Sequence, residues 1–187
     1  EDDGPTLQAS DVTALSAVVV DESALPADGG DGVRSVTLDA SDAFAVADFG
    51  TDGEGSVQYA LTLDGTNVDS GLINLDGEHI VLNRDGNTVT GSVTVDSVTT
   101  NYFTLTLNDE TGEITFTQLN NIAHSSNPNP DDVASLDLGT DVLTVERTVT
   151  DADGDSVVEA VDIGGELFKI EDDGPTLQAS DVTALSA

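Results

Sequence analysis

Three aspartates in one short turn, Asp151, Asp153 and Asp155, form the most informative motif of the chain. They alternate with Ala152 and Gly154, a spacing that lets the three carboxylates point inward together while backbone carbonyls add further oxygen atoms. Calcium prefers six to eight such ligands at about 2.3–2.6 Å. An EF-hand is excluded, because that loop needs its glycine at the sixth position and Gly154 stands at the fourth. The motif predicts a calcium site, and an ordinary acidic hairpin turn is the alternative.

A second group of acidic residues stands in the segment 1–5 (EDDGP), which recurs at 171–175. Proline fixes its own φ and pushes the preceding residue toward an extended backbone, so each segment suits a short, directed linker. Close acidic pairs at a domain junction repel one another by about 1 kcal/mol or more, even in a water-like dielectric. A cation bound between these carboxylates would replace the repulsion with attraction and hold the junction together. The alternative is a solvated, flexible linker. The candidate ligands are Asp2, Asp3, Asp172 and Asp173.

These acidic motifs are expected to meet at one pole of the folded unit. In an immunoglobulin-like sandwich the turn that joins the last two strands lies where the chain enters, which would bring the turn 151–155 close to Asp2 and Asp3. Asp21 and Glu22 follow the apolar run 18–20 and are expected to add ligands at the same pole. The remaining acids are expected to be solvated.

The first seventeen residues of the chain return unchanged at its end, because residues 1–17 and 171–187 both read EDDGPTLQASDVTALSA. An identity of this length indicates a tandem array with a period of 170 residues. The chain is then divided into a linker (1–5), a folded repeat (6–170), and a second linker with the first segment of the next repeat (171–187). Identical copies favour a mechanical or spacing role over catalysis.

Between the two copies, apolar and polar residues alternate with period 2, and Val and Thr are abundant, which predicts strands. Turn residues separate roughly nine or ten such segments, so we expect an all-β fold, an immunoglobulin-like antiparallel β-sandwich that forms one unit of a tandem array. The only helix candidate lies within 121–136. The clearest strands are 56–64, 88–96, 101–108, 113–119, 142–150 and 156–163.

The composition limits the partners of the chain. Against 37 Asp and Glu there are 4 Lys and Arg, which gives a formal net charge of −33. This balance argues against nucleic acid and anionic membranes as partners, since both need clustered basic residues. No apolar run approaches the roughly 20 residues of a membrane span. The chain has no cysteine to form disulfides. Its many acidic residues could instead bind calcium, which would stabilise the fold. The alternative is that they form a solvated acidic surface suited to a saline habitat.

Catalysis finds little support in the sequence, and we expect no enzyme. His79 and His124 are isolated, which favours structural roles for both. There is no phosphate-binding glycine loop, nucleophile elbow or zinc helix motif.

Taken in order, several segments resemble the extender repeats of giant repeats-in-toxin (RTX) adhesins, which Gram-negative bacteria export by type I secretion. The resemblance covers the whole 170-residue unit. Each segment alone is a weak signal, but their order is fairly specific. They are 20–23 (VDES), 59–62 (YALT), 70–72 (SGL), 79–82 (HIVL), 89–91 (VTG), 111–115 (TGEIT) and the closing series from TDADGDSV at 150–157 to EDDGP at 171–175.

The resemblance implies tandem immunoglobulin-like sandwiches whose junctions are stiffened by Ca²⁺. The partners it implies are calcium ions and adjacent identical repeats in the same chain, in a monomeric protein that does not insert into a membrane. The implied location is extracellular, on the bacterial cell surface, where an outer membrane-attached adhesin projects distal ligand-binding domains for attachment and biofilm formation. Low cytosolic calcium would keep the chain unfolded for export, and external calcium would then fold it.

Two other functions remain to be weighed. A glycan- or protein-binding module would show exposed aromatic residues, but Tyr59, Phe103 and Phe116 follow strand patterns that predict core positions. An acidic enzyme of a saline habitat would need a cleft with convergent polar groups, and the sequence offers no set of residues for one.

Overall fold

A computed structural model describes residues 4–6, 10–22, 32–125 and 132–172. These residues form twelve strands and two short 3-10 helices, η1 (Val12–Ala14) and η3 (Ala40–Ala43). The strands are β1 (Val18–Asp21), β2 (Ser35–Asp39), β3 (Glu54–Leu63), β4 (Val68–Ile73), β5 (His79–Asp85), β6 (Thr88–Val95), β7 (Val98–Leu107), β8 (Glu113–Gln118), β9 (Val133–Asp137), β10 (Leu143–Asp151), β11 (Ser156–Asp162) and β12 (Gly165–Glu171).

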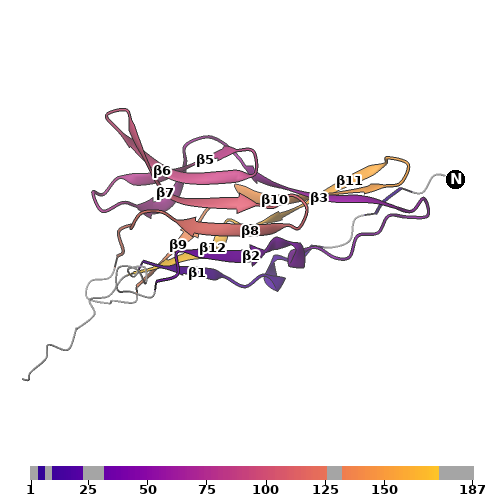
Figure 1. Ribbon diagram of the computed structural model, residues 1–187, viewed down its shortest axis with the longest axis horizontal. Coiled ribbons are helices and arrows are strands. Elements are labelled where there is room, and N and C mark those ends of the chain that lie inside the picture. The colour runs from indigo at the N-terminus through magenta and orange to yellow at the C-terminus, as the bar shows by residue number, and fades with distance from the viewer. Residues whose placement is uncertain (1–3, 7–9, 23–31, 126–131, 173–187) are drawn as a thin grey trace, which may run out of the picture.

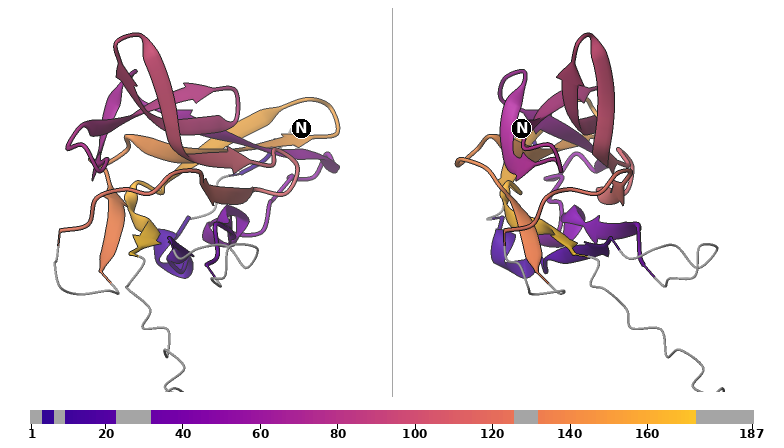
Figure 2. Two further views of the ribbon diagram at one scale, coloured as in Figure 1. Left: turned by 60° about the vertical axis from the view of Figure 1, so that its left-hand side comes forward. Right: turned by 90° about the vertical axis from the view of Figure 1, so that its left-hand side faces the viewer.

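The strands form three sheets. The largest has the order β2-β8-β7-β6-β5-β4, and the two three-stranded sheets have the orders β11-β10-β3 and β1-β12-β9. All pairs are antiparallel except β1 with β12, the first and last strands, which run parallel. In Figures 1 and 2, β1, β9 and β12 lie together on one side of the molecule, while the β10–β11 hairpin reaches toward the end labelled N.

The apolar core lies between the sheets and explains why the alternating segments become strands. In β8, Ile114 and Phe116 point inward and are at most 1% exposed, while their neighbours face outward. Phe116 packs edge-on against Phe103 of β7 at 5.8 Å and against Phe168 of β12 at 5.5 Å between ring centroids. In a β-sandwich, side chains from the inner faces of two sheets pack together to form the core, as these rings do.

The predicted all-β sandwich is confirmed, and its six clearest strands correspond to β3, β6, β7, β8, β10 and β11. The helix expected within 121–136 is absent from the described part of that range, where 133–136 instead belong to β9, and 126–131 lie outside the described residues. β9 takes strand form because it pairs with β12, and this distant pairing overrides a weak local helix signal.

A glycine in the middle of β6 makes room for the core. Gly91 pairs directly with Phe103, and a Cβ at position 91 would lie 2.4–2.8 Å from three atoms of that ring. Such contacts are closer than van der Waals packing permits, so the ring or the strand would have to move.

We therefore expect Gly91→Ala to lower the free energy of unfolding by about 1–3 kcal/mol in urea denaturation. Gly165→Ala is the matched control, because a Cβ there meets no atom within 4 Å. Its effect should stay within about 0.5 kcal/mol. Equal losses for the two variants would show that the Phe103 contact does not limit position 91.

Candidate metal centres

The first candidate centre is the turn between β10 and β11. The backbone N–H of Asp151 donates to the carbonyl of Asp155 at 3.0 Å and closes the turn, and Gly154 adopts φ +105°. Carboxylate oxygens of Asp151, Asp153 and Asp155 all lie within 4.8 Å of one another. The structure thus gathers the three carboxylates that the sequence motif predicted to converge.

Asp151 is the anchor of this turn, with only 3% of its surface exposed. Its Oδ1 accepts hydrogen bonds from the backbone N–H groups of Gly154 (3.0 Å) and Asp155 (2.9 Å). Its Oδ2 is buried and has no hydrogen-bond partner among the described residues. Burial works to raise the pKa of Asp151, but hydrogen bonding at Asp153, Gly154 and Asp155 outweighs it and holds the pKa below its ordinary value. The turn therefore presents a buried carboxylate oxygen of an ionised Asp151 that accepts no hydrogen bond from the described residues.

A bulge in the neighbouring strand positions Asp151. The pairing of β3 with β10 shifts register between Thr150 and Asp151, and Gly55 lies at that shift. A Cβ on Gly55 would lie 2.2 Å from the carbonyl oxygen of Asp151, so only glycine permits this approach of the two backbones. The sequence alone does not reveal this role of Gly55, because a bulge depends on the partner strand.

The first EDDGP segment reaches the same turn. A Cβ on Gly4 would lie 3.4 Å from Cβ of Asp155 and 3.8 Å from Oδ2 of Asp151. Gly4 thus lies against the turn 151–155, as expected for the segment where the chain enters. Asp2 and Asp3 themselves lie outside the described residues.

The second candidate centre consists of Glu22, His124 and Asp172, which we call the β12-end cluster. One ligand atom from each of the three lies within 4.8 Å of the others. Backbone hydrogen bonds hold the segments together, since the N–H of Glu22 donates to Glu171 at 3.0 Å and that of Asp172 donates to Asp132 at 2.8 Å. The cluster forms because the parallel pairing of β1 with β12 ends at Asp21 and Glu171.

Glu22 is held firmly within the β12-end cluster. It is 2% exposed, and its Oε1 accepts hydrogen bonds from Nε2 of Gln118 (2.5 Å) and the backbone N–H of Ile122 (2.8 Å). Its Oε2 lies 3.5 Å from Nε2 of His124. One oxygen therefore fixes the carboxylate, and the other faces the imidazole.

The expectation of a single acidic pole was wrong for Glu22. The β12-end cluster lies where β1 and β12 end, away from the β10–β11 turn, which projects from the opposite end of the molecule in Figure 1. Asp21, the last residue of β1, belongs to neither cluster. Asp173 lies outside the described residues.

His124 was interpreted as an isolated structural residue and was missed, since no local motif signals a contact with residues this far away in the sequence.

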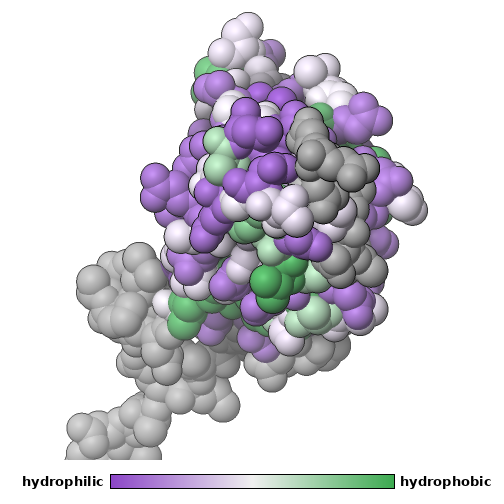
Figure 3. All heavy atoms as spheres, turned by 90° about the vertical axis from the view of Figure 1, so that its right-hand side faces the viewer, coloured by the Kyte–Doolittle hydropathy of each residue, from purple (hydrophilic) through white to green (hydrophobic). Residues whose placement is uncertain are grey.

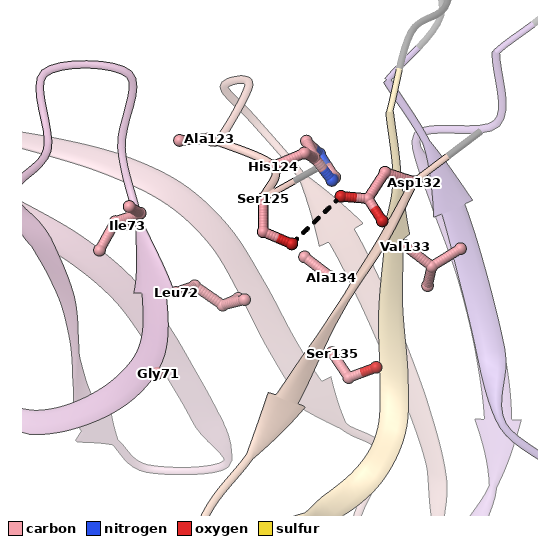
Figure 4. A pocket seen from close by; sticks show the side chains of 10 residues that line it. All are labelled: Gly71, Leu72, Ile73, Ala123, His124, Ser125, Asp132, Val133, Ala134 and Ser135. Carbon is pink, nitrogen blue, oxygen red and sulfur yellow. Dashed lines mark hydrogen bonds between the residues drawn. The ribbon is translucent and has the colours of Figure 1, made fainter. Parts of the chain in front are cut away.

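A cavity of about 280 Å³ opens beside the β12-end cluster, between β4 and β9. His124 and Asp132 line it together with Leu72 and Ser125, and Ser125 donates a hydrogen bond to Asp132 at 3.4 Å (Figure 4). The imidazole therefore borders the cavity, although its side chain is only 4% exposed. At the other end of the molecule, hydrophilic residues cover most of the upper part of the surface (Figure 3).

The fold and these clusters define a β-sandwich domain with candidate cation sites at its two ends. The model of a family described as a domain of unknown function, DUF5801, matches residues 17–164, and the chain belongs to this family. No curated protein and no solved structure matches the chain. Among the described residues, no helix is long and apolar enough to cross a membrane.

Protonation of His124 should make stability depend on pH. Burial of the ring disfavours its charged form, but the carboxylates of Glu22, Asp172 and Asp132 outweigh this and raise the pKa of His124 above its ordinary value. A group whose pKa is higher in the folded state contributes most below its unfolded pKa, here about 6.5. The contribution is lost as the pH rises through the folded pKa.

In metal-free buffer, we therefore expect the melting temperature to fall as the pH is raised from 6 toward 9, and His124→Gln to flatten this dependence. His79→Gln is the control, because His79 is exposed and pairs with Asp69 at the surface. Differential scanning calorimetry at fixed ionic strength measures both. A slope that survives in His124→Gln would assign the titration to other groups.

Proposed function

We propose that this chain is a structural spacer repeat of a calcium-dependent bacterial surface adhesin of the RTX type, with Ca²⁺ bound at the β10–β11 turn to stiffen the junction with the preceding repeat. The observation that carries the proposal is the buried, unpartnered Oδ2 of Asp151, which faces two further carboxylates and the linker glycine Gly4. Three acidic oxygens without imidazole or thiolate suit a hard cation such as calcium.

The spacing of the linker supports a tight junction. Glu171 is the last residue of β12, and 171–175 repeat the sequence of 1–5, so Gly174 corresponds to Gly4. In an array, Gly174 would lie against the next repeat's β10–β11 turn just as Gly4 does here. Three residues of fully extended chain span at most about 11 Å. Adjacent sandwiches would therefore nearly touch, and a cation at the junction would restrict their relative motion.

The aromatic residues support a spacer over a binding module. Phe103 and Phe116 are at most 1% exposed, and Tyr59 is half-buried against the core. None of the seven aromatic side chains is exposed. A glycan-binding surface usually presents such rings to solvent, so no observation favours that function here. On the spacer proposal the repeat has no turnover, acts outside the cell, and has adjacent repeats as its partners.

Calcium titration followed by calorimetry tests the metal site. At ten to a hundred times Kd, Ca²⁺ should raise the melting temperature by about 3–10 °C. Asp151→Asn keeps an acceptor for the turn but loses the charge, so it should lose most of this rise. Asp85→Asn, at the exposed end of β5, removes the same charge elsewhere and should respond like the natural chain. An undiminished rise in Asp151→Asn would overturn the site.

Small-angle X-ray scattering on two joined repeats tests the mechanical role. With calcium, the maximum dimension should approach that of two sandwiches end to end, and chelation should broaden the distance distribution. Identical profiles with and without calcium would contradict the stiffening of the junction, even if the ion binds.

A further inference from the structure

We infer that the β12-end cluster, Glu22, His124 and Asp172, is a site for a divalent transition metal of the zinc type, separate in place and chemistry from the calcium turn. The cluster differs from other acidic groups of the chain in one independent observation. The side chain of His124 is 4% exposed, and its Nδ1 has no hydrogen-bond partner among the described residues. Its Nε2 forms no hydrogen bond but lies 3.5 Å from Oε2 of Glu22, at ion-pair distance. Burying an imidazole with one nitrogen unpaired and the other in a long ion pair is costly, and a metal ligated by the ring would offset part of that cost.

The side-chain types in the β12-end cluster indicate which metal it would bind. Imidazole nitrogen is a common ligand of zinc, copper, iron and nickel, whereas calcium takes oxygen ligands and more of them. One imidazole and two carboxylates provide three protein ligands, the number that leaves a fourth zinc position for water. The cavity of about 280 Å³ bordered by His124 supplies room for that water. The β12-end cluster therefore fits zinc better than it fits calcium.

The geometry of the cluster is close to that of a tetrahedral site. Zinc–ligand bonds of 2.0–2.1 Å place neighbouring ligand atoms about 3.3–3.4 Å apart. Nε2 of His124 and Oε2 of Glu22 are separated by 3.5 Å, so the two can bind one ion with little movement. Asp172 needs a larger adjustment, since its ligand atom lies within 4.8 Å of the others. Asp172 is also half-buried at the end of β12, where such an adjustment is easy.

A second set of contacts orients the carboxylate. Gln118 and the backbone of Ile122 both donate to Oε1 of Glu22, which directs Oε2 toward His124. Groups that hydrogen-bond a ligand in this way raise metal affinity by fixing its orientation. Gln118 therefore acts as a positioning residue for the proposed site.

The position of the site gives it a structural consequence. Its ligands follow β1, follow β8 and follow β12, so one ion would join three segments that are distant in the sequence at the point where the chain leaves the sandwich. The inference does not depend on the spacer function, since it concerns residues within one sandwich.

The experiment is a zinc titration of the metal-stripped chain in buffer with saturating Ca²⁺, monitored by isothermal titration calorimetry and melting temperature. We expect one zinc ion per chain and a rise in melting temperature. His124→Gln should weaken zinc binding at least tenfold. His79→Gln, which alters the only other histidine, should bind zinc like the natural chain. Asp172→Asn is the second variant, chosen because a half-buried residue at the end of a strand tolerates the change, and it should also weaken zinc at least tenfold.

Cobalt substitution identifies the ligand. The intense visible absorption of tetrahedral Co²⁺ should develop in the natural chain and in His79→Gln, and should be lost in His124→Gln. The inference is overturned if the natural chain binds no zinc, or if His124→Gln and Asp172→Asn bind it unchanged. It is also overturned if His79→Gln abolishes binding. The calcium-induced rise in melting temperature should persist in Asp172→Asn, so failure of this site and failure of the calcium site are distinguishable.

Discussion

Oδ2 of Asp151 lies buried where β3, β10 and the backbone at Gly4 meet, and no described residue donates a hydrogen bond to it. The same carboxylate stays ionised because its other oxygen accepts two backbone N–H groups. Glycine at position 55 allows the backbone of β3 to lie directly against Asp151. This charge and the two carboxylates beside it repel one another. The spacer proposal rests on the expectation that a bound cation would relieve this repulsion.

The two ends of the sandwich differ in ligand chemistry. The β10–β11 turn offers oxygen alone, whereas the β12-end cluster includes an imidazole. Metals that differ in hardness would therefore divide between the ends without competing strongly. If the repeats join as proposed, the EDDGP segment runs between both sites, with Asp172 in one and Gly174 against the other. Each junction would then combine two kinds of metal within a few residues.

The sequence predicted the strands well because period-2 alternation directly reports which face of a strand is buried. It predicted the convergence of carboxylates at Asp151 because all three aspartates lie within five consecutive residues. It could not predict where Glu22 lies in the fold, because that position depends on the parallel pairing of β1 with β12, at the far end of the chain. His124 was missed for the same reason. Its partners come from two other segments, and alternation says nothing about which strands become neighbours. The role of Gly55 could not be predicted either, because its bulge exists only against β10.

The parallel pairing of β1 with β12 sets how the domain would respond to tension. A pull transmitted along the chain enters β1 at Val18 and leaves β12 at Glu171, which are opposite ends of the paired stretch. The load is then applied along the strands, so the hydrogen bonds between them resist in shear, all together. An antiparallel pair pulled from adjacent ends would instead open one bond at a time. The parallel pair would thus carry a pull on the chain in shear, between the strand that follows the entry of the chain and the strand that precedes its exit.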